Sequence, residues 1–152
     1  MKPSDKIKEL KIDLPEAPDP VGAYVAFRIT NNLLYISGQL PISKDSEMIK
    51  GKIDKDLSLE DGQKASRLCV INILAQAKKA MNGNIDAIKG CVKITGYVNS
   101  TEDFIDQPKV INPASEMLSA VFSEKGKHAR AAVSSNSLPL GVAVEIEAIF
   151  EI

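Results

Sequence analysis

The chain has few of the residues that build metal centres and covalent cross-links. Its 152 residues include two cysteines, one histidine and no tryptophan. Cys69 and Cys91 stand far apart and form no Cys-x-x-Cys motif, so neither a structural zinc site nor a disulfide framework is expected. Cysteine often behaves as a small apolar residue, which favours two buried free thiols over the alternative of a single disulfide. The sequence therefore predicts no metal site.

Signals for nucleotide, nucleic-acid and membrane binding are also lacking. Neither a Walker A nor a G-x-G-x-x-G motif occurs, and no G-x-S-x-G motif accompanies the only histidine, His128. Lys and Arg number 19 against 20 Asp and Glu, which leaves no excess of cations to neutralise phosphates. No apolar run is long enough to span a bilayer, and the N-terminus lacks the apolar core of a signal peptide. We expect one cytoplasmic domain over residues 1–152, with neither membrane nor nucleic acid as a partner.

Apolar periodicity predicts five strands and two helices. Four prolines among the first twenty residues indicate an extended lead-in over residues 1–22. Alternation with a period of two predicts strands over 23–29, 33–40, 91–99, 129–135 and 142–150. Apolar stripes at helical spacing predict helices over 58–81 and over 106–126, while 41–57 is a charged loop.

The element order β-β-α-β-α-β-β gives each helix one apolar stripe and each strand one apolar face. The simplest arrangement places both helices on one face of a single sheet, which is an α+β two-layer sandwich. The expected residues of the other face are Tyr24, Tyr35, Ser37, Thr95, Arg130 and Glu145, with Ala132, Ala143 and Ile149 among them. A face of such mixed polarity is either solvated or packed against other subunits.

Arg130 is the first candidate for chemistry. Alternation along its strand predicts that Ala129, Ala131 and Val133 face the helices and that Arg130 faces away from them. A guanidinium group matches a carboxylate in a bidentate manner, and the small neighbours leave room for a small carboxylate ligand. The alternative is an exposed arginine paired with a glutamate across the sheet.

Glu145 is the second candidate, on the same strand face as Glu147 and Glu151. Such glutamates are commonly just solvated. The functional alternative needs a partly desolvated carboxylate that accepts a proton from water near neutral pH. Tyr24 offers a hydrogen-bond donor or only surface cover, and His128 is interpreted as an exposed residue between a loop and a strand.

Several segments together resemble the RidA/YjgF family of reactive intermediate deaminases, which also carries the label endoribonuclease L-PSP. They are LLYISGQLP over 33–41, Asn112, Ala129-Arg130, Leu138-Pro139 and VEIEAI over 144–149, and the resemblance runs from about residue 20 to 149. It implies a chorismate-mutase-like α+β fold and a homotrimer with a cleft at each subunit interface. The implied activity is the hydrolysis of enamines and imines, such as 2-imino acids, to 2-keto acids and ammonia without a metal or organic cofactor.

The resemblance also implies roles for individual residues. Arg130 would hold the substrate carboxylate and Glu145 would orient or activate the water. The positions matching the substrate-binding residues of the family are Tyr24, Ser37, Asn112 and Ala132. At Ala132 many deaminating members have a cysteine or another polar residue, and Val25-Ala26 also departs from the usual pattern, which suggests a subgroup.

Two other functions stay open at this point. One is a non-catalytic protein that binds a small carboxylate metabolite in the same cleft. The other is a ribonuclease or translation inhibitor, as the second family label suggests. The net charge of −1 and the 5% aromatic content argue against the latter, because they offer no evident track for phosphates and no stacking platform.

Overall fold

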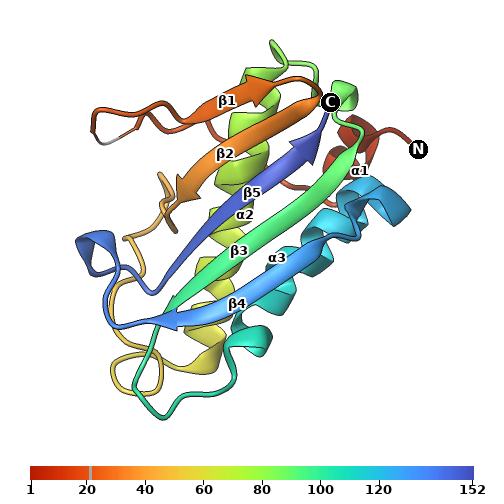
Figure 1. Cartoon of the computed structure of the whole chain (residues 1–152). Coiled ribbons are helices and arrows are strands. Elements are labelled where there is room, and N and C mark those ends of the chain that lie inside the picture. Colours follow the sequence, from red (N-terminus) through yellow and green to blue (C-terminus); the bar gives the residue numbers. More distant parts are fainter. Residues whose placement is uncertain (21) are drawn as a thin grey trace.

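The computed structural model describes residues 1–20 and 22–152. Its main elements are α1 (Pro3–Glu9), β1 (Phe27–Thr30), β2 (Leu33–Gln39), α2 (Leu59–Ala80), β3 (Gly90–Asn99), α3 (Gln107–Phe122), β4 (Ala129–Ser135) and β5 (Val144–Glu151). Within these residues, five strands form one sheet in the order β1-β2-β5-β3-β4, in which β3 and β4 run parallel and the other neighbours run antiparallel (Figure 1). Short 3-10 turns lie at Ile85–Ala87, Ser123–Gly126 and Pro139–Gly141.

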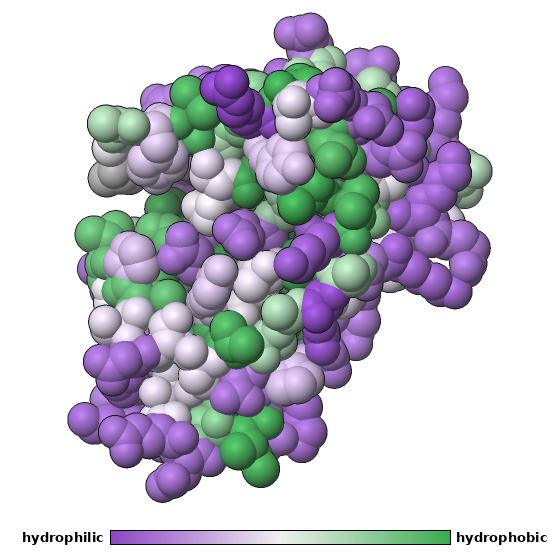
Figure 2. Space-filling model, viewed as in Figure 1, coloured by the Kyte–Doolittle hydropathy of each residue, from purple (hydrophilic) through white to green (hydrophobic). Residues whose placement is uncertain are grey.

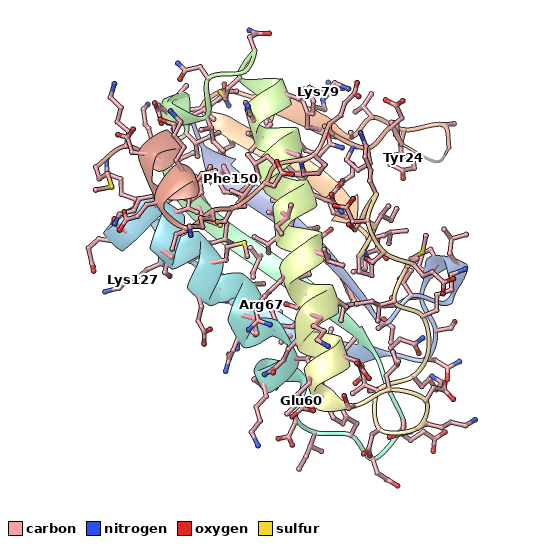
Figure 3. All side chains as sticks on the ribbon, turned by 180° about the vertical axis from the view of Figure 1, so that it is seen from behind. Tyr24, Glu60, Arg67, Lys79, Lys127 and Phe150 are labelled. Atoms are coloured by element: carbon pink, nitrogen blue, oxygen red, sulfur yellow. The ribbon has the colours of Figure 1, made fainter. Side chains whose placement is uncertain are left out.

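The helices cover one face of this sheet, which confirms the predicted α+β two-layer sandwich. Seen from behind, α2 and α3 lie across the sheet with α1 beside them (Figure 3). The core between the layers is built mainly from aliphatic side chains, and its largest fully buried members include Phe150, Leu34, Ile73, Ile94 and Leu118. Burial of this apolar surface is the main stabilisation of the fold.

The long helix α2 begins and ends where the sequence indicates. The Ser58 hydroxyl accepts a hydrogen bond from the Asp61 backbone N–H at 3.2 Å, and the Asp61 carboxylate accepts one from the Ser58 backbone N–H at 3.0 Å. This reciprocal pair satisfies two backbone donors that a helix leaves unpaired at its start. After the helix, Asn82 and Gly83 adopt positive φ values of 52° and 90°, which turn the chain away.

The predicted lead-in is wrong over its first part, because residues 3–9 form α1. Pro3 occupies the first turn of this helix, where a missing N–H removes no hydrogen bond and a fixed φ is favourable. Ser4 attaches α1 to the turn before β3, since its backbone N–H and its hydroxyl both donate to the Asp86 carboxylate at 2.8 Å. Ile7 then contributes to the core. Position 21 lies outside the described residues.

Two strands begin later than predicted. The first starts at Phe27 rather than at 23, and residues 22–24 and 26 form bends. The last starts at Val144 rather than at 142. Ala143 is fully buried, and its N–H donates to the Ile49 carbonyl at 3.0 Å, so it does not lie on the open face as expected. The loop over residues 41–57 covers this position, which the strand pattern alone does not reveal.

The face of the sheet without helices is mixed in polarity, as predicted. Figure 2 shows apolar and polar side chains interspersed over this face. Tyr35 and Val133 are 41% and 44% exposed, and Glu147 is also exposed. We call this surface the open face.

Candidate functional site

Arg130 does not lie on the open face, which corrects the prediction. Its register partner on β3 is Ile94, a fully buried residue of the core beneath the helices. Directly paired residues share a face of a sheet, so Arg130 projects toward α3. Ala132 pairs with Gly96 and is also on the helix side, partly buried against the core. The sequence does not reveal this orientation. Alanines occur on both faces of β4, so the hydropathy of successive residues does not show which face is buried.

Hydrogen bonds hold the Arg130 guanidinium against α3. Its Nη1 donates to Asn112 Oδ1 at 2.9 Å and to Ser115 Oγ at 3.2 Å. Ser115 Oγ lies 2.9 Å from His128 Nε2, and His128 Nδ1 lies 2.6 Å from the Gly126 carbonyl oxygen. We call Asn112, Ser115, His128 and Arg130 the Arg130 cluster.

No carboxylate neutralises this guanidinium within the part of the chain that the structure describes. The ion pairs found there involve lysines, and Arg130 takes part in none of them. The alternative that Arg130 pairs with a glutamate across the sheet is therefore wrong. The cluster orients a positive charge with neutral acceptors and leaves the charge available to a ligand.

The packing of α3 on the sheet explains how this cluster forms. Asn112 and Ser115 are three residues apart, so they share one side of the helix. At Gly96 of β3 a Cβ atom would overlap the Ile111 side chain, so glycine at this position allows α3 to approach the sheet closely. This approach brings Asn112 and Ser115 within hydrogen-bond distance of Arg130.

Glu145 lies on the open face, as predicted, and its carboxylate occupies space left by a glycine. A Cβ atom at Gly38 would overlap the Glu145 Oε1 atom. Gly38 lies in an irregular part of β2, where the register with β5 shifts between Ile36 and Gln39. Glu145 is thereby half-buried. Its burial, followed by the nearby charge of Glu147, raises the pKa of the Glu145 carboxyl above its ordinary value.

Tyr24 and Ser37 lie near Gly38. The Ser37 hydroxyl donates to the Val25 carbonyl at 2.7 Å, so its hydrogen is already used and its lone pairs remain as acceptors. Tyr24 is 51% exposed and lines a small hollow together with Gly38. We call Tyr24, Ser37, Gly38 and Glu145 the Glu145 cluster. Figure 3 places Tyr24 in the segment before β1, with α2 between it and α3.

A larger hollow of about 370 Å³ lies on the open face beside this cluster. Its lining includes Tyr35, Ser37, Lys93, Thr95 and Glu147. Ser37 thus belongs both to the Glu145 cluster and to the lining of this hollow, whereas neither Arg130 nor Glu145 lines the hollow. Within one chain, the proposed catalytic pair shares no cavity among those described.

The two clusters are well separated within one chain. Glu145 pairs with Tyr97 on β3, whereas Arg130 pairs with Ile94, three positions further back along β3. Strand spacing and rise per residue place the Cα atoms of Arg130 and Glu145 about 14 Å apart. Their side chains also leave opposite faces of the sheet. The structure therefore brings Asn112 and Ala132 near Arg130, and brings Tyr24 and Ser37 near Glu145, but does not bring the two sets together.

Sequence reasoning missed some residues of these clusters. His128 was expected to be exposed, but it is half-buried with both ring nitrogens in hydrogen bonds. Burial lowers the pKa of the His128 imidazole, and the Arg130 charge lowers it further. Two sequence signals could have found Ser115 and His128. Ser115 follows Asn112 by three residues, which places both on one side of a helix, and His128 precedes Arg130 by two residues, which places both on one face of an extended segment. Tyr97, the register neighbour of Glu145, was also missed; its Oη donates to Glu147 Oε1 at 3.5 Å.

The cysteines are both free and buried, which confirms the prediction of two thiols. Burial raises the pKa of the Cys91 thiol to about 12, so it is unsuited to nucleophilic chemistry at neutral pH. Over residues 1–20 and 22–152, no group of three His, Cys, Asp or Glu side chains is arranged to hold a metal ion. No helix in the same residues has the length and apolar character needed to cross a bilayer.

Residues 5–151 match the family model described as "YjgF/chorismate mutase-like, putative endoribonuclease". The chain belongs to this YjgF family. Protein TCP17 of Trypanosoma cruzi is 37% identical over 147 residues, covering 96% of this chain and 91% of that protein. These matches confirm the predicted family and cover nearly the whole chain.

Two solved structures extend the comparison of this YjgF-family chain. A protein of unknown function, Atu1372 from Agrobacterium tumefaciens, superposes with a TM-score of 0.91 at 43% identity, covering 99% of this chain and 92% of that one. RidA from Psychrobacter sp. PAMC 21119 superposes with a TM-score of 0.63 at 30% identity, covering 90% of this chain and 94% of that one. The fold is shared with both, and much more of its detail is shared with the first.

Proposed function

We propose that this YjgF-family protein hydrolyses 2-imino acids and their enamine tautomers to 2-keto acids and ammonia. The observation that carries the proposal is the Arg130 guanidinium, which is positioned by neutral acceptors and has no acidic partner among the described residues. A 2-imino acid carries its carboxylate next to the electrophilic imine carbon. Fixing the carboxylate therefore also fixes the carbon that water must attack.

Glu145 supplies the second function that hydrolysis needs. Its raised pKa suits a group that accepts a proton from water as the water oxygen bonds to the imine carbon. The resulting carbinolamine takes a proton on nitrogen, expels ammonia and leaves a carbonyl group. One water is consumed and one ammonia is released, with no oxidant or reductant. The Ser37 hydroxyl, whose hydrogen is donated to Val25, keeps lone pairs that can accept the imine N–H.

The separation of the clusters requires a second copy of the chain. We propose a homotrimer in which the β4 edge of one subunit meets the open face of its neighbour, so that Arg130 and Glu145 of one site come from different subunits. β4 is an edge strand, which leaves it accessible. Exposed apolar side chains on the open face, such as Tyr35 and Val133, favour its burial against another subunit.

The comparisons support membership of the family, and none of the names they give states an imine or enamine substrate. The name RidA belongs to a relative whose fold matches less closely than that of the Agrobacterium protein. Ala132 presents only a methyl group beside Arg130, which favours an alternative in which the site binds a small carboxylate without turnover. The endoribonuclease description of the family is a third possibility, which the near-neutral charge disfavours.

Mixing two inactive variants tests the proposal. Arg130→Ala and Glu145→Gln should each lose hydrolysis of freshly generated 2-iminopropionate, followed as pyruvate formation. Co-expressed in equal amounts, they form intact sites wherever a Glu145→Gln subunit supplies Arg130 and an Arg130→Ala subunit supplies Glu145. Random assembly makes about a quarter of the sites intact, so about a quarter of wild-type activity should return.

The outcomes separate the alternatives. No recovery would place both residues in the same subunit's site and overturn the shared arrangement. Wild-type protein that binds pyruvate but hydrolyses no 2-imino acid would support the binding function. Cleavage of RNA by the purified wild-type protein, lost in Arg130→Ala, would support the endoribonuclease description instead.

A further inference from the structure

We propose that Ser115 and His128 are positioning residues that fix which edge of the Arg130 guanidinium meets the substrate carboxylate. The inference deepens the proposed function and rests on it for the identity of the ligand. Neither residue touches the substrate in this arrangement. They act through the direction of hydrogen bonds that end at Arg130.

The chain of hydrogen bonds begins at the Gly126 carbonyl. A carbonyl oxygen only accepts, so His128 Nδ1, 2.6 Å away, carries the hydrogen and donates it. In a neutral imidazole, Nε2 then has a lone pair and accepts from the Ser115 hydroxyl at 2.9 Å. The half-buried setting of the ring favours this neutral form, because it disfavours the imidazolium. The Ser115 hydrogen is thereby directed away from Arg130.

This direction leaves the Ser115 oxygen free to accept from Arg130. The two hydrogens of Nη1 go to Ser115 Oγ at 3.2 Å and to Asn112 Oδ1 at 2.9 Å. Among the described residues, Nε and Nη2 donate to no acceptor. Those two atoms form the side-on edge of the guanidinium, whose parallel N–H bonds match the two oxygens of a carboxylate.

The hydrogen-bond chain positions Arg130 without an ion pair. A carboxylate partner within the chain would neutralise the guanidinium charge and occupy its donors. Here, neutral groups accept only the two Nη1 hydrogens. The geometry thus assigns the Nε–Nη2 edge to the ligand, and Ser115 and His128 together orient that edge.

The test compares variants that break or keep the hydrogen-bond chain. Ser115→Ala and His128→Leu break it, whereas Ser115→Thr keeps a hydroxyl and His128→Gln keeps an acceptor for Ser115. Ser119→Ala is the matched control, since Ser119 is one turn further along α3 and lies outside the chain. For each variant, the Kd for pyruvate, KM and kcat for a 2-imino acid, and the crystal structure are determined.

The breaking variants should weaken pyruvate binding and raise KM by about 3- to 10-fold, the range for one hydrogen bond, while kcat changes less than KM. Their crystal structures should show the guanidinium turned from Asn112. Ser115→Thr, His128→Gln and Ser119→Ala should stay within about twofold of wild type.

Failure of this inference is distinct from failure of the proposed function. If the wild type binds pyruvate or turns over a 2-imino acid but the breaking variants keep its Kd and KM, the positioning role is overturned and the function stands. If the wild type does neither, yet the guanidinium shifts only in the breaking variants, the ligand is misassigned and the positioning role stands. An unmoved guanidinium in those variants overturns the positioning role in either case.

Discussion

The Arg130 cluster orients a positive charge with hydrogen bonds, whereas the Glu145 cluster places a negative charge in a space left by a glycine. In the first, Nη1 of Arg130 meets two neutral acceptors and the charge stays unpaired among the described residues. In the second, burial and the neighbouring Glu147 raise the pKa of the Glu145 carboxyl, so its ionised form is disfavoured. In the proposed function, the first cluster binds the substrate carboxylate and the second accepts a proton.

Under the proposed function, neither cluster is a complete site within one chain. A carboxylate anchor needs a fixed direction, which hydrogen bonds from α3 supply. A base needs a pKa nearer neutrality, which partial desolvation supplies. Because the two groups lie on opposite faces of the sheet, the proposed function takes them from different copies of the chain.

The largest expected effect comes from replacing the Arg130 guanidinium, with its several N–H donors, by a group that keeps only the positive charge. Arg130→Lys should lower kcat/KM by about 100-fold or more, because an ammonium group cannot bind a carboxylate in a bidentate manner and loses the hold of Asn112. Steady-state kinetics with a 2-imino acid measures this. Arg67→Lys, an exposed change on α2, is the control and should be neutral. A fully active Arg130→Lys enzyme would show that only charge matters at this cluster.

A smaller effect should follow from filling the space at Gly38. The backbone of Gly38 does not have a positive φ, so the main conflict of Gly38→Ala is with the flexible Glu145 carboxylate. We expect kcat to fall about 10-fold with little change in the Kd for pyruvate, because the base is displaced while the anchor is untouched. Kinetics and calorimetry on one preparation measure both quantities. A loss confined to pyruvate binding would contradict the division of roles between the clusters.

The smallest expected effect is a gain in thermal stability, whereas the two preceding substitutions lower activity. Since the folded-state pKa of Glu145 is raised, the stabilisation linked to its protonated form is present at low pH and is lost as pH rises through that pKa. Glu145→Gln should therefore raise Tm at pH 7 by about 1–2 °C, a modest gain because the group is partly screened by solvent, and should change Tm little at pH 4. Thermal denaturation at both pH values checks this.

Glu151→Gln provides the control for that measurement. Glu151 lies on the same face of β5 but is exposed, so its substitution should leave Tm nearly unchanged at both pH values. An equal rise in Tm for both variants would reflect general relief of negative charge on β5 and would remove the special status of Glu145.

Much of the fold could be predicted because its signals are local. Ser58 and Gly83 delimit α2, and the apolar stripes of both long helices are regular enough to place them on one face of the sheet. The sequence does not reveal α1, because the prolines of residues 1–22 indicate an extended chain, although a proline in the first turn is compatible with a helix. The two late strand starts were missed because residues 41–57 and the bends within 22–26 follow tertiary packing rather than a period of two.

For this protein, the sequence by itself determined the α+β class and which side chains are candidates for chemistry, because periodicity and residue type are properties of short segments. Only the tertiary structure decided that Arg130 turns toward α3, that Ser115 and His128 join it, and that Glu145 lies over Gly38. Those outcomes depend on strand register and on the close approach of α3 at Gly96, which bring together residues distant in the chain.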